Sequence, residues 1–327
     1  MKCLITGAAG FIGSHLCERL IAEGHQVHGL DNFSTGKEET LDAITNKNFS
    51  YSDVDISNTP CATYFKGVDW VFHLAAKADV VPSIERPYLY HDTNVTGTIR
   101  MLEYAKEANV KRFIYAASSS CYGIPDQYPT PETAPCKPMY PYALTKYLGE
   151  QYVLHWAKVY KLPALSLRLF NVYGPRARTS GSYGAVFGVF LSQLANKAPL
   201  TVIGDGSQSR DFTYVTDVVE AFIKSAESDI SGKVINIGSG ESKSINDLIK
   251  YLDHPSTITI PDRPGEPRIT QADRTKAYLN LGWVPKVSFK DGVQIMKEHI
   301  NDYKDAPLWS PEKIEKATES WFKYLGG

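Results

Sequence analysis

The chain has 327 residues, of which 43% are hydrophobic and 22% charged, and its formal net charge is −1. This length can bury a large core and predicts one large domain or two closely joined ones. The balanced charge argues against a nucleic-acid or membrane partner. Because no apolar run reaches membrane-spanning length and the first strand starts at Lys2, we expect no signal peptide and a cytoplasmic protein.

The first two predicted elements are a strand over Lys2–Thr6 and a helix over Phe11–Glu23. Between them Gly7, Gly10 and Gly13 form G-x-x-G-x-x-G, a variant of the Rossmann fingerprint with one more residue in its first gap. Glycines at these places permit a tight turn, close approach of the backbone to a pyrophosphate, and packing of the helix on the strand. The amide groups at the helix start favour phosphate, so the opening predicts a dinucleotide site.

A second predicted strand, Gln26–Leu30, is followed by Asp31, 18 positions after Gly13. An acidic residue at this place accepts hydrogen bonds from the ribose 2′-hydroxyl of NAD, and its charge repels the 2′-phosphate of NADP. We therefore predict NAD as the cofactor.

Strand and helix patterns continue to alternate up to residue 170. The predicted strands are Phe49–Ser52, Asp69–His73, Arg112–Ala116 and Ala164–Leu169, and the predicted helices are Tyr88–Ala108 and Tyr140–Tyr160. This alternation predicts an α/β fold of the Rossmann type with a doubly wound parallel sheet.

The sequence changes character after Pro175, to a Gly/Ser-rich loop over residues 179–184, a helix ending at Asn196 and shorter elements. We place a domain boundary between Asn171 and Arg176. Residues 1–172 then form an NAD-binding domain, and residues 173–327 form mainly a smaller mixed α/β substrate domain, with segments of residues 210–240 returning to the first. At the end of the chain, Trp309–Leu325 predicts an amphipathic helix that packs through Trp321, Phe322 and Leu325 and carries no chemistry.

A second motif, Tyr142-Ala-Leu-Thr-Lys146, lies inside a predicted helix. Positions i and i+4 share a helix face, so the ammonium, together with a nicotinamide ring, is expected to lower the pKa of the phenol and make it a base. Such a pair is common on protein surfaces. Here, however, the run Ser118-Ser119-Ser120 follows a strand, and the carboxyl ends of strands are where open α/β sheets bind ligands. The combination predicts hydride chemistry on a bound nicotinamide.

The five cysteines, at positions 3, 17, 61, 121 and 136, show neither metal spacing nor a disulfide framework, and the eight histidines form no cluster. We predict no metal site, a reducing compartment, and small core residues at Cys3 and Cys17. His73 ends an apolar strand and is expected to be a buried structural histidine.

Several further stretches complete a resemblance to a known family that covers essentially the whole chain. They are Asp31-Asn32-Phe33-Ser34, Asp55-Ile56, His73-Leu74-Ala75-Ala76, Asn94-Val95-Thr96-Gly97-Thr98, Tyr122-Gly123, residues 168–176, Gly204-Asp205-Gly206, Arg210-Asp211-Phe212 and Arg263-Pro264-Gly265-Glu266. With the two motifs above, they resemble the extended short-chain dehydrogenase/reductases, and within them the nucleotide-sugar 4-epimerases.

The resemblance implies three kinds of site residue. The catalytic residues are Ser118, which stands four positions before the tyrosine of Tyr122-Gly123, with Tyr142 and Lys146. The cofactor contacts are Gly7, Gly10, Phe11, Ile12, Gly13, Asp31, Asn32, Ser34, Gly36, Asp55, Ile56, Leu74, Ala75, Ala76, Asn94, Tyr142, Lys146 and Phe170. The substrate contacts are Ser83, Ser118, Ser119, Ser120, Tyr142, Asn171, Arg210, Arg263, Glu266 and Thr270.

The neighbours of Ser118 indicate the reaction. Family 4,6-dehydratases carry Asp-Glu at the next two positions and uronate decarboxylases a Glu at the second, whereas Ser119 and Ser120 stand here. The resemblance therefore implies NAD-dependent epimerisation of a UDP-hexose at the sugar 4-position through a 4-keto intermediate. The small Thr270 resembles enzymes that accept 2-acetamido sugars, and Val81 replaces an arginine of uronate epimerases.

Three other functions stay open on the sequence: a net 4-ketoreductase or dehydrogenase, a UDP-glucuronate 4-epimerase, and a silent NAD-binding regulatory protein. The family also implies a homodimer formed by the helices near residues 88–108 and 140–160. Candidate interface residues are Ile99, Leu102, Tyr147, Leu154 and Trp156, some of which could instead face the sheet.

Overall fold

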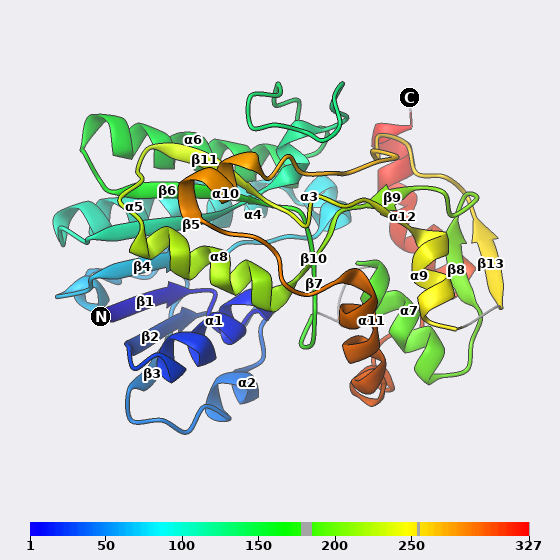
Figure 1. Ribbon diagram of the computed structural model, residues 1–327, viewed down its shortest axis with the longest axis horizontal. Coiled ribbons are helices and arrows are strands. Elements are labelled where there is room, and N and C mark those ends of the chain that lie inside the picture. The colour runs from blue at the N-terminus through cyan, green and yellow to red at the C-terminus, as the bar shows by residue number, and fades with distance from the viewer. Residues whose placement is uncertain (178–184, 254–255, 327) are drawn as a thin grey trace.

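The structure is a computed structural model that describes residues 1–177, 185–253 and 256–326. Figure 1 shows a layered α/β body at the N-terminal end and a smaller group of helices and short strands at the other, with the C-terminus in the smaller part. The predicted Gly/Ser-rich loop over residues 179–184 lies outside the described residues.

A parallel sheet forms the centre of the larger part. Within the described residues it has seven strands: β1 (Lys2–Thr6), β2 (Gln26–Asp31), β3 (Phe49–Asp53), β4 (Trp70–His73), β5 (Arg112–Ser118), β6 (Ala164–Leu169) and β11 (Lys233–Ile237). Their order is β11-β6-β5-β4-β1-β2-β3. The strand order reverses between β1 and β4, and ligands bind beside such a point in open α/β sheets. The predicted Rossmann-type sheet is confirmed.

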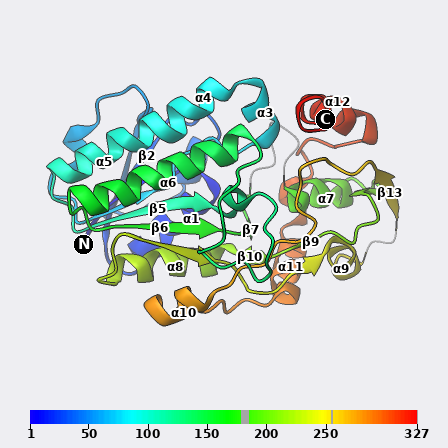
Figure 2. The same ribbon diagram turned by 90° about the horizontal axis from the view of Figure 1, so that it is seen from above.

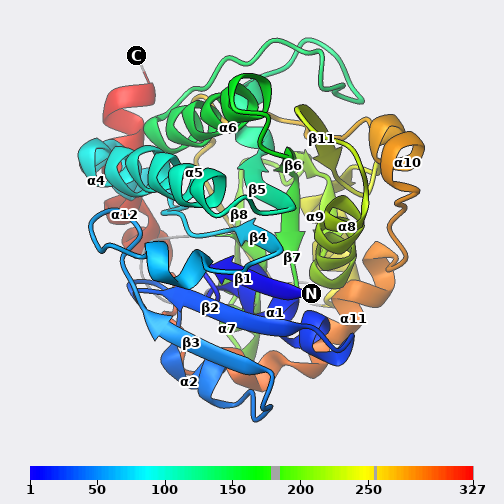
Figure 3. The ribbon, with the colours of Figure 1, turned by 90° about the vertical axis from the view of Figure 1, so that its left-hand side faces the viewer.

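Helices cover both faces of this sheet, as Figures 2 and 3 show. One face carries α1 (Phe11–Ala22), α8 (Val215–Glu227) and α10 (Thr275–Leu281). The other carries α4 (Pro87–His91), η2 (Asp92–Thr96), α5 (Gly97–Glu107) and α6 (Pro141–Val159). The predicted helix over residues 88–108 is thus one helical run with a π-helical turn, η2, in its middle. The remaining short helices of the larger part lie in the connections between strands and are α2 (Glu38–Asp42), η1 (Ala62–Phe65), α3 (Val80–Glu85) and η3 (Ser119–Tyr122).

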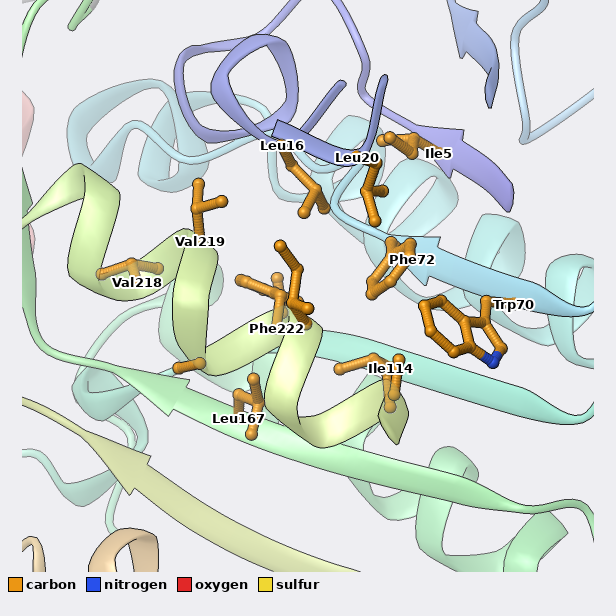
Figure 4. Close-up of a cluster of buried hydrophobic side chains, with 14 of the residues drawn as sticks. Ile5, Leu16, Leu20, Trp70, Phe72, Ile114, Leu167, Val218, Val219 and Phe222 are labelled. Carbon is orange, nitrogen blue, oxygen red and sulfur yellow. The ribbon is translucent and has the colours of Figure 1, made fainter. Parts of the chain in front are cut away.

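Apolar side chains fill both layers between helices and sheet. Leu16 and Leu20 of α1 and Phe222 of α8 meet Ile5 and Phe72 of the sheet in one fully buried cluster, which Figure 4 shows in close-up. Cys3 and Cys17 belong to this cluster, so the prediction of small core residues is confirmed. The opposite layer contains Leu102 and Trp156 in a second cluster.

The smaller part is built from short elements around an aromatic core. They are β7 (Asn171–Tyr173), α7 (Val186–Ala195), β8 (Leu200–Ile203), β9 (Ser209–Arg210), β10 (Phe212–Tyr214), β12 (Lys243–Ser244), α9 (Ile245–Tyr251), β13 (Thr257–Ile260), α11 (Phe289–Glu298), η4 (Ile300–Tyr303) and α12 (Pro311–Leu325). Tyr173 stacks on Phe187 and Phe212 stacks on Phe289, with ring centroids 4.5 and 5.1 Å apart. Aromatic pairs at these spacings hold the short elements together.

The chain does not simply leave the sheet after β6. It enters the smaller part through β7, comes back through α8, and places β11 beside β6 in parallel. The division at residues 172 and 173 stays a prediction. No helix in the described part of the chain is long and apolar enough to cross a membrane.

Candidate active site

A cavity of about 670 Å³ lies where the carboxyl edge of the sheet meets the smaller part of the molecule. Residues of both parts line it, from Gly7 after β1 to Trp321 of α12. It therefore joins the predicted cofactor and substrate regions in one space.

The glycine turn forms one wall. The amide of Gly7 donates to the carbonyl of Leu30 at 2.8 Å, and Gly7 has a φ of +72°. A methyl group on Gly13 would overlap the carbonyl oxygen of Gly7, so the start of α1 sits directly on the turn. No side chain caps this helix start, and Gly7, Gly10, Phe11, Ile12 and Gly13 all line the cavity. The backbone amides at the start of α1 are uncapped, and glycines leave open the space that a Cβ atom would fill. This arrangement fits the pyrophosphate of NAD.

Asp31 ends β2 beside this turn. Its Oδ2 accepts the amide of Ala9 and its Oδ1 accepts the amide of Phe33, both at 2.9 Å. Burial raises the pKa of Asp31, and these two backbone hydrogen bonds act against that rise. Each carboxylate oxygen can accept a further bond. Asp31 is therefore able both to hold the turn and to accept a ribose hydroxyl.

The other predicted cofactor residues divide into two groups. Leu74, Ala76 and Phe170 line the cavity. The others contact neighbouring residues instead. The Asn32 side chain donates a hydrogen bond to Asp55 at 3.1 Å and accepts one from the amide of Ser34, and the amide of Ala75 donates to the Thr6 hydroxyl. Asn94 is hydrogen-bonded to the backbone of Lys77 and to the Thr145 hydroxyl, while Gly36 packs on Ala9 and Ile56 on Gly97. None of the residues in this second group lines the cavity, so their contact with NAD stays a prediction.

Ser118, Tyr142 and Lys146 line the cavity together. Ser118 is the last residue of β5, and its Oγ lies 2.7 Å from the Oγ of Ser120. Tyr142 and Lys146 stand in the first turns of α6, which β5 and η2 contact. The Nζ of Lys146 is 4.3 Å from the ring centroid of Tyr115 and makes no hydrogen bond to any described residue. A buried ammonium that faces a cavity in this way can donate to hydroxyl groups of a bound nucleotide.

The predicted lowering of the phenol pKa is not found in the protein alone. Burial raises the pKa of Tyr142, and Asp79 adds to the rise, while the Ser118 side chain opposes it. Burial also lowers the pKa of Lys146 to about 7, against the opposing charge of Glu150. The cavity wall buries both groups, and this desolvation opposes the charged form of each. The spacing of the two residues in the sequence does not reveal their burial.

The substrate end is built around two arginines that share one carboxylate. Arg210 donates to Glu266 at 2.7 Å, and Arg263 lies 3.8 Å from the other oxygen of Glu266. Thr270 donates to Asn171 at 3.0 Å. All five line the cavity. Guanidinium groups bind phosphate through paired N–H donors, so the two arginines suit a diphosphate.

Ser119 and Ser120 line the cavity as predicted, and Val81 also lines it. Ser83 is different: its side chain is fully buried, it donates to the carbonyl of Val80, and it is not in the cavity wall. The sequence placed it on the substrate, whereas the first turn of α3 points it inward.

Several lining residues were not singled out from the sequence, among them Asp79, Tyr140 and Trp321. Asp79 stands in the loop after β4, Tyr140 stacks in parallel on Tyr142 with centroids 6.4 Å apart, and Trp321 of α12 lies against Tyr140. Helix α12 therefore lines the cavity through Trp321, and the expectation that it carries no chemistry stays a prediction. Its apolar face differs from the prediction, since Trp321 is buried but Phe322 is exposed and Leu325 only half-buried. No motif marked these residues, because a tryptophan in an amphipathic helix indicates packing equally well.

Two buried polar groups brace the wall from behind. His73 lies between the hydroxyls of Thr6 and Thr98, at 2.7 and 2.9 Å, and burial lowers its pKa to about 3, which confirms a structural histidine. Glu150, one turn beyond Lys146, accepts two bonds from the guanidinium of Arg168, at 3.0 and 2.6 Å. Arg168 stacks on the ring of Tyr122 behind Ser118. This ion pair connects α6 to β6 directly under the catalytic residues.

The sequence of the chain also matches a known protein family. Residues 3–238 match the NAD dependent epimerase/dehydratase family. The chain belongs to this family. A UDP-glucose 4-epimerase of Mycolicibacterium smegmatis is 37% identical over 305 residues, which cover 90% of this chain and 96% of that one.

Two solved structures of the family are similar over nearly the whole chain. A UDP-N-acetylglucosamine 4-epimerase of Methanobrevibacter ruminantium, in complex with UDP-N-acetylmuramic acid, superposes with a TM-score of 0.87 at 32% identity, covering 92% of this chain and 98% of that one. A UDP-glucuronic acid 4-epimerase of Bacillus cereus, in complex with UDP-glucuronic acid and NAD, gives 0.85 at 35% identity, covering 92% and 99%. This epimerase/dehydratase chain is thus similar to NAD-dependent 4-epimerases in fold and sequence.

Proposed function

We propose that this protein is an NAD-dependent 4-epimerase of a UDP-hexose. The observation that carries the proposal is the set of neighbours in one cavity: Ser118, Tyr142 and Lys146 stand beside the glycine turn, and serines occupy the two positions after Ser118. Dehydration or decarboxylation would need an acid at those positions. Oxidation and reduction at one carbon need only the three catalytic residues.

The residues divide the work as follows. Tyr142 removes the proton from the sugar 4-hydroxyl, and the Ser118 hydroxyl donates a hydrogen bond to the same oxygen. Lys146 holds the ribose of NAD beside Tyr142. Arg210 and Arg263 hold the diphosphate of the UDP-sugar, so the 4-keto sugar is free to rotate and present its other face. When bound, NAD supplies the hydride acceptor and a positive charge beside the phenol. Tyr142 then returns the proton to the other epimer.

The sugar is proposed to be glucose/galactose or their 2-acetamido derivatives. Thr270 is small and tied to Asn171, which leaves room at the sugar end, and the apolar Val81 offers nothing to a carboxylate. UDP-glucuronate is the second candidate, because a UDP-glucuronic acid 4-epimerase superposes so well.

The test is incubation without added cofactor with UDP-glucose, UDP-N-acetylglucosamine, UDP-glucuronate or a GDP-hexose, read by NMR. Conversion of one of the first two to its 4-epimer is the expected result. Accumulation of a reduced or oxidised sugar in proportion to consumed cofactor would show a net oxidoreductase and overturn the proposal. Turnover of the GDP-hexose alone would refute the UDP assignment.

Asp31→Asn tests the cofactor preference. The amide keeps one acceptor oxygen for the Ala9 or Phe33 amide and loses the other, and the charge that repels a 2′-phosphate is lost. We expect the preference for NAD over NADP to narrow by about tenfold, which corresponds to about 1.4 kcal/mol. Calorimetric titration with both cofactors measures it, and an unchanged ratio would show that Asp31 does not face the ribose.

We also propose a homodimer through α6 and the helical run formed by α4, η2 and α5. Leu102 and Trp156 are buried in the core and cannot serve, which corrects two of the interface candidates. A different stripe on one side of α6 is exposed: Leu144, Tyr152 and Val159, at 45, 37 and 49% exposure. Such a stripe suits a self-complementary two-fold contact.

Light scattering tests the dimer at micromolar concentration. The wild type is expected to be a dimer and Leu144→Glu with Tyr152→Glu a monomer, because charges on an apolar interface lose their hydration. Leu279→Glu is the matched control, since Leu279 is 71% exposed on α10, on the opposite face of the sheet. A monomeric wild type would refute the interface.

We propose the cytoplasm as the compartment of this protein, because all five cysteines are free thiols.

A further inference from the structure

Two cysteines lie side by side behind the catalytic serine. The Sγ atoms of Cys121 and Cys136 are 3.8 Å apart. Cys121 belongs to η3, directly after Ser118–Ser120, and Cys136 lies in the segment that leads into α6 and Tyr142. They share a small apolar cluster with Tyr122 and Phe170. The pair thus joins the two chain segments that carry the catalytic residues.

The backbone brings the two sulfurs together. Gly123 has a φ of +65°, and any side chain there would overlap the carbonyl oxygen of Lys137. The residue two positions after Cys121 is therefore in contact with the residue next to Cys136. The approach of the two thiols is a consequence of this close crossing.

The two thiols differ in reactivity. Cys136 is half-buried, and its hydrogen bond with Cys121, helped by the charge of Arg168, lowers its pKa to about 7 against the effect of burial. Cys121 is buried, and the same hydrogen bond raises its pKa. Burial raises the pKa of Cys3, Cys17 and Cys61. A half-buried thiol with a lowered pKa, next to a buried thiol with a raised pKa, is the arrangement of an attacking and a resolving cysteine.

We propose that Cys121 and Cys136 are a peroxide-sensitive site that forms a reversible disulfide and lowers turnover. The Cys136 thiolate attacks a peroxide oxygen, the O–O bond breaks, and sulfenic acid forms while the leaving hydroxide or alkoxide takes a proton from solvent and becomes water or alcohol. The Cys121 thiol then attacks the sulfenic sulfur, the S–S bond forms, and hydroxide leaves and takes up the thiol proton as water. Two thiols are oxidised and one peroxide is reduced.

The effect on turnover follows from position. The sulfurs must approach from 3.8 Å to about 2.05 Å. Cys121 is next to Ser120, whose amide and hydroxyl hold Ser118. Displacement of a catalytic group by about 1 Å can cost a hundredfold in rate. We expect oxidised enzyme to lose at least about tenfold in turnover. This loss rests on the proposed function, whereas disulfide formation does not.

The test treats the full-length protein with hydrogen peroxide, blocks remaining thiols and maps the peptides by mass spectrometry. The expected product is a crosslink between the peptides of Cys121 and Cys136, with activity lost and then restored by dithiothreitol. Cys136→Ser should form no crosslink and keep its activity in peroxide. Cys61→Ala, which removes a cysteine outside the pair, should behave as the wild type.

Disulfide formation and the loss of turnover can each be refuted by a different result. Absence of the crosslink at peroxide doses that oxidise a model thiol overturns the site, whether or not the protein epimerises a sugar. A crosslink with unchanged turnover overturns the regulatory effect. Equal inactivation of wild type and Cys136→Ser would show that peroxide acts elsewhere. Failure of the proposed function appears instead as no turnover before oxidation, with the crosslink still formed.

Discussion

Tyr142→Phe is expected to fold, to bind NAD, and to lose at least about a hundredfold in turnover. A general base contributes about a hundredfold to ten-thousandfold, and each tenfold is about 1.4 kcal/mol of activation free energy. The substitution removes one oxygen atom from a cavity wall and leaves the ring stacked on Tyr140. Packing is therefore retained while the proton acceptor is lost.

Tyr147→Phe provides the matched control. Tyr147 stands on the same helix but packs in the cluster of Tyr122 and Phe170, and it does not line the cavity. Its turnover should stay near the wild-type value. Steady-state rates of the two variants and the wild type are measured by NMR. Absorbance of the purified proteins gives their cofactor content. Near-normal turnover of Tyr142→Phe would require another base, and Asp79 would be the first to examine.

Glu150→Gln should lower the free energy of unfolding by about 3–5 kcal/mol. The side chains of Arg168 and Glu150 are 5 and 1% exposed, and removal of one partner from a buried pair leaves an uncompensated charge in the interior. The Nη1 of Arg168 already lacks a hydrogen-bond partner among the described residues. Few other groups are therefore available to take up the charge.

Glu23→Gln is the comparison for this loss. Glu23 pairs with Arg19 on the surface, where the two side chains are 30 and 44% exposed, and such pairs contribute about 1 kcal/mol or less. Urea unfolding of both variants measures the difference. Equal stability of Glu150→Gln and the wild type would mean that water or a rearranged side chain solvates Arg168.

Local patterns predicted the sheet well because its strands are short apolar runs bounded by turns. Lys2–Thr6 and Ala164–Leu169 have the predicted bounds. The glycine turn and the spacing of Tyr142 and Lys146 are also local, so they were found. What failed depends on distant packing. Ser83 points inward from the first turn of α3 and Trp321 lines the cavity from α12. Neither position can be read from the residue spacing within its own helix. The pKa of Tyr142 depends on the whole wall around it.

The return of β11 to the sheet has a consequence for how the protein is made. Lys233 follows Leu169 by 64 positions, so the nascent chain completes β6 well before the strand that covers its outer edge exists. Until then β6 offers an open, mostly apolar edge, which is a template for pairing with another chain. A fragment that stops near residue 172 keeps that edge permanently. We therefore expect a fragment of residues 1–172 to be less soluble than a fragment that extends through residue 237.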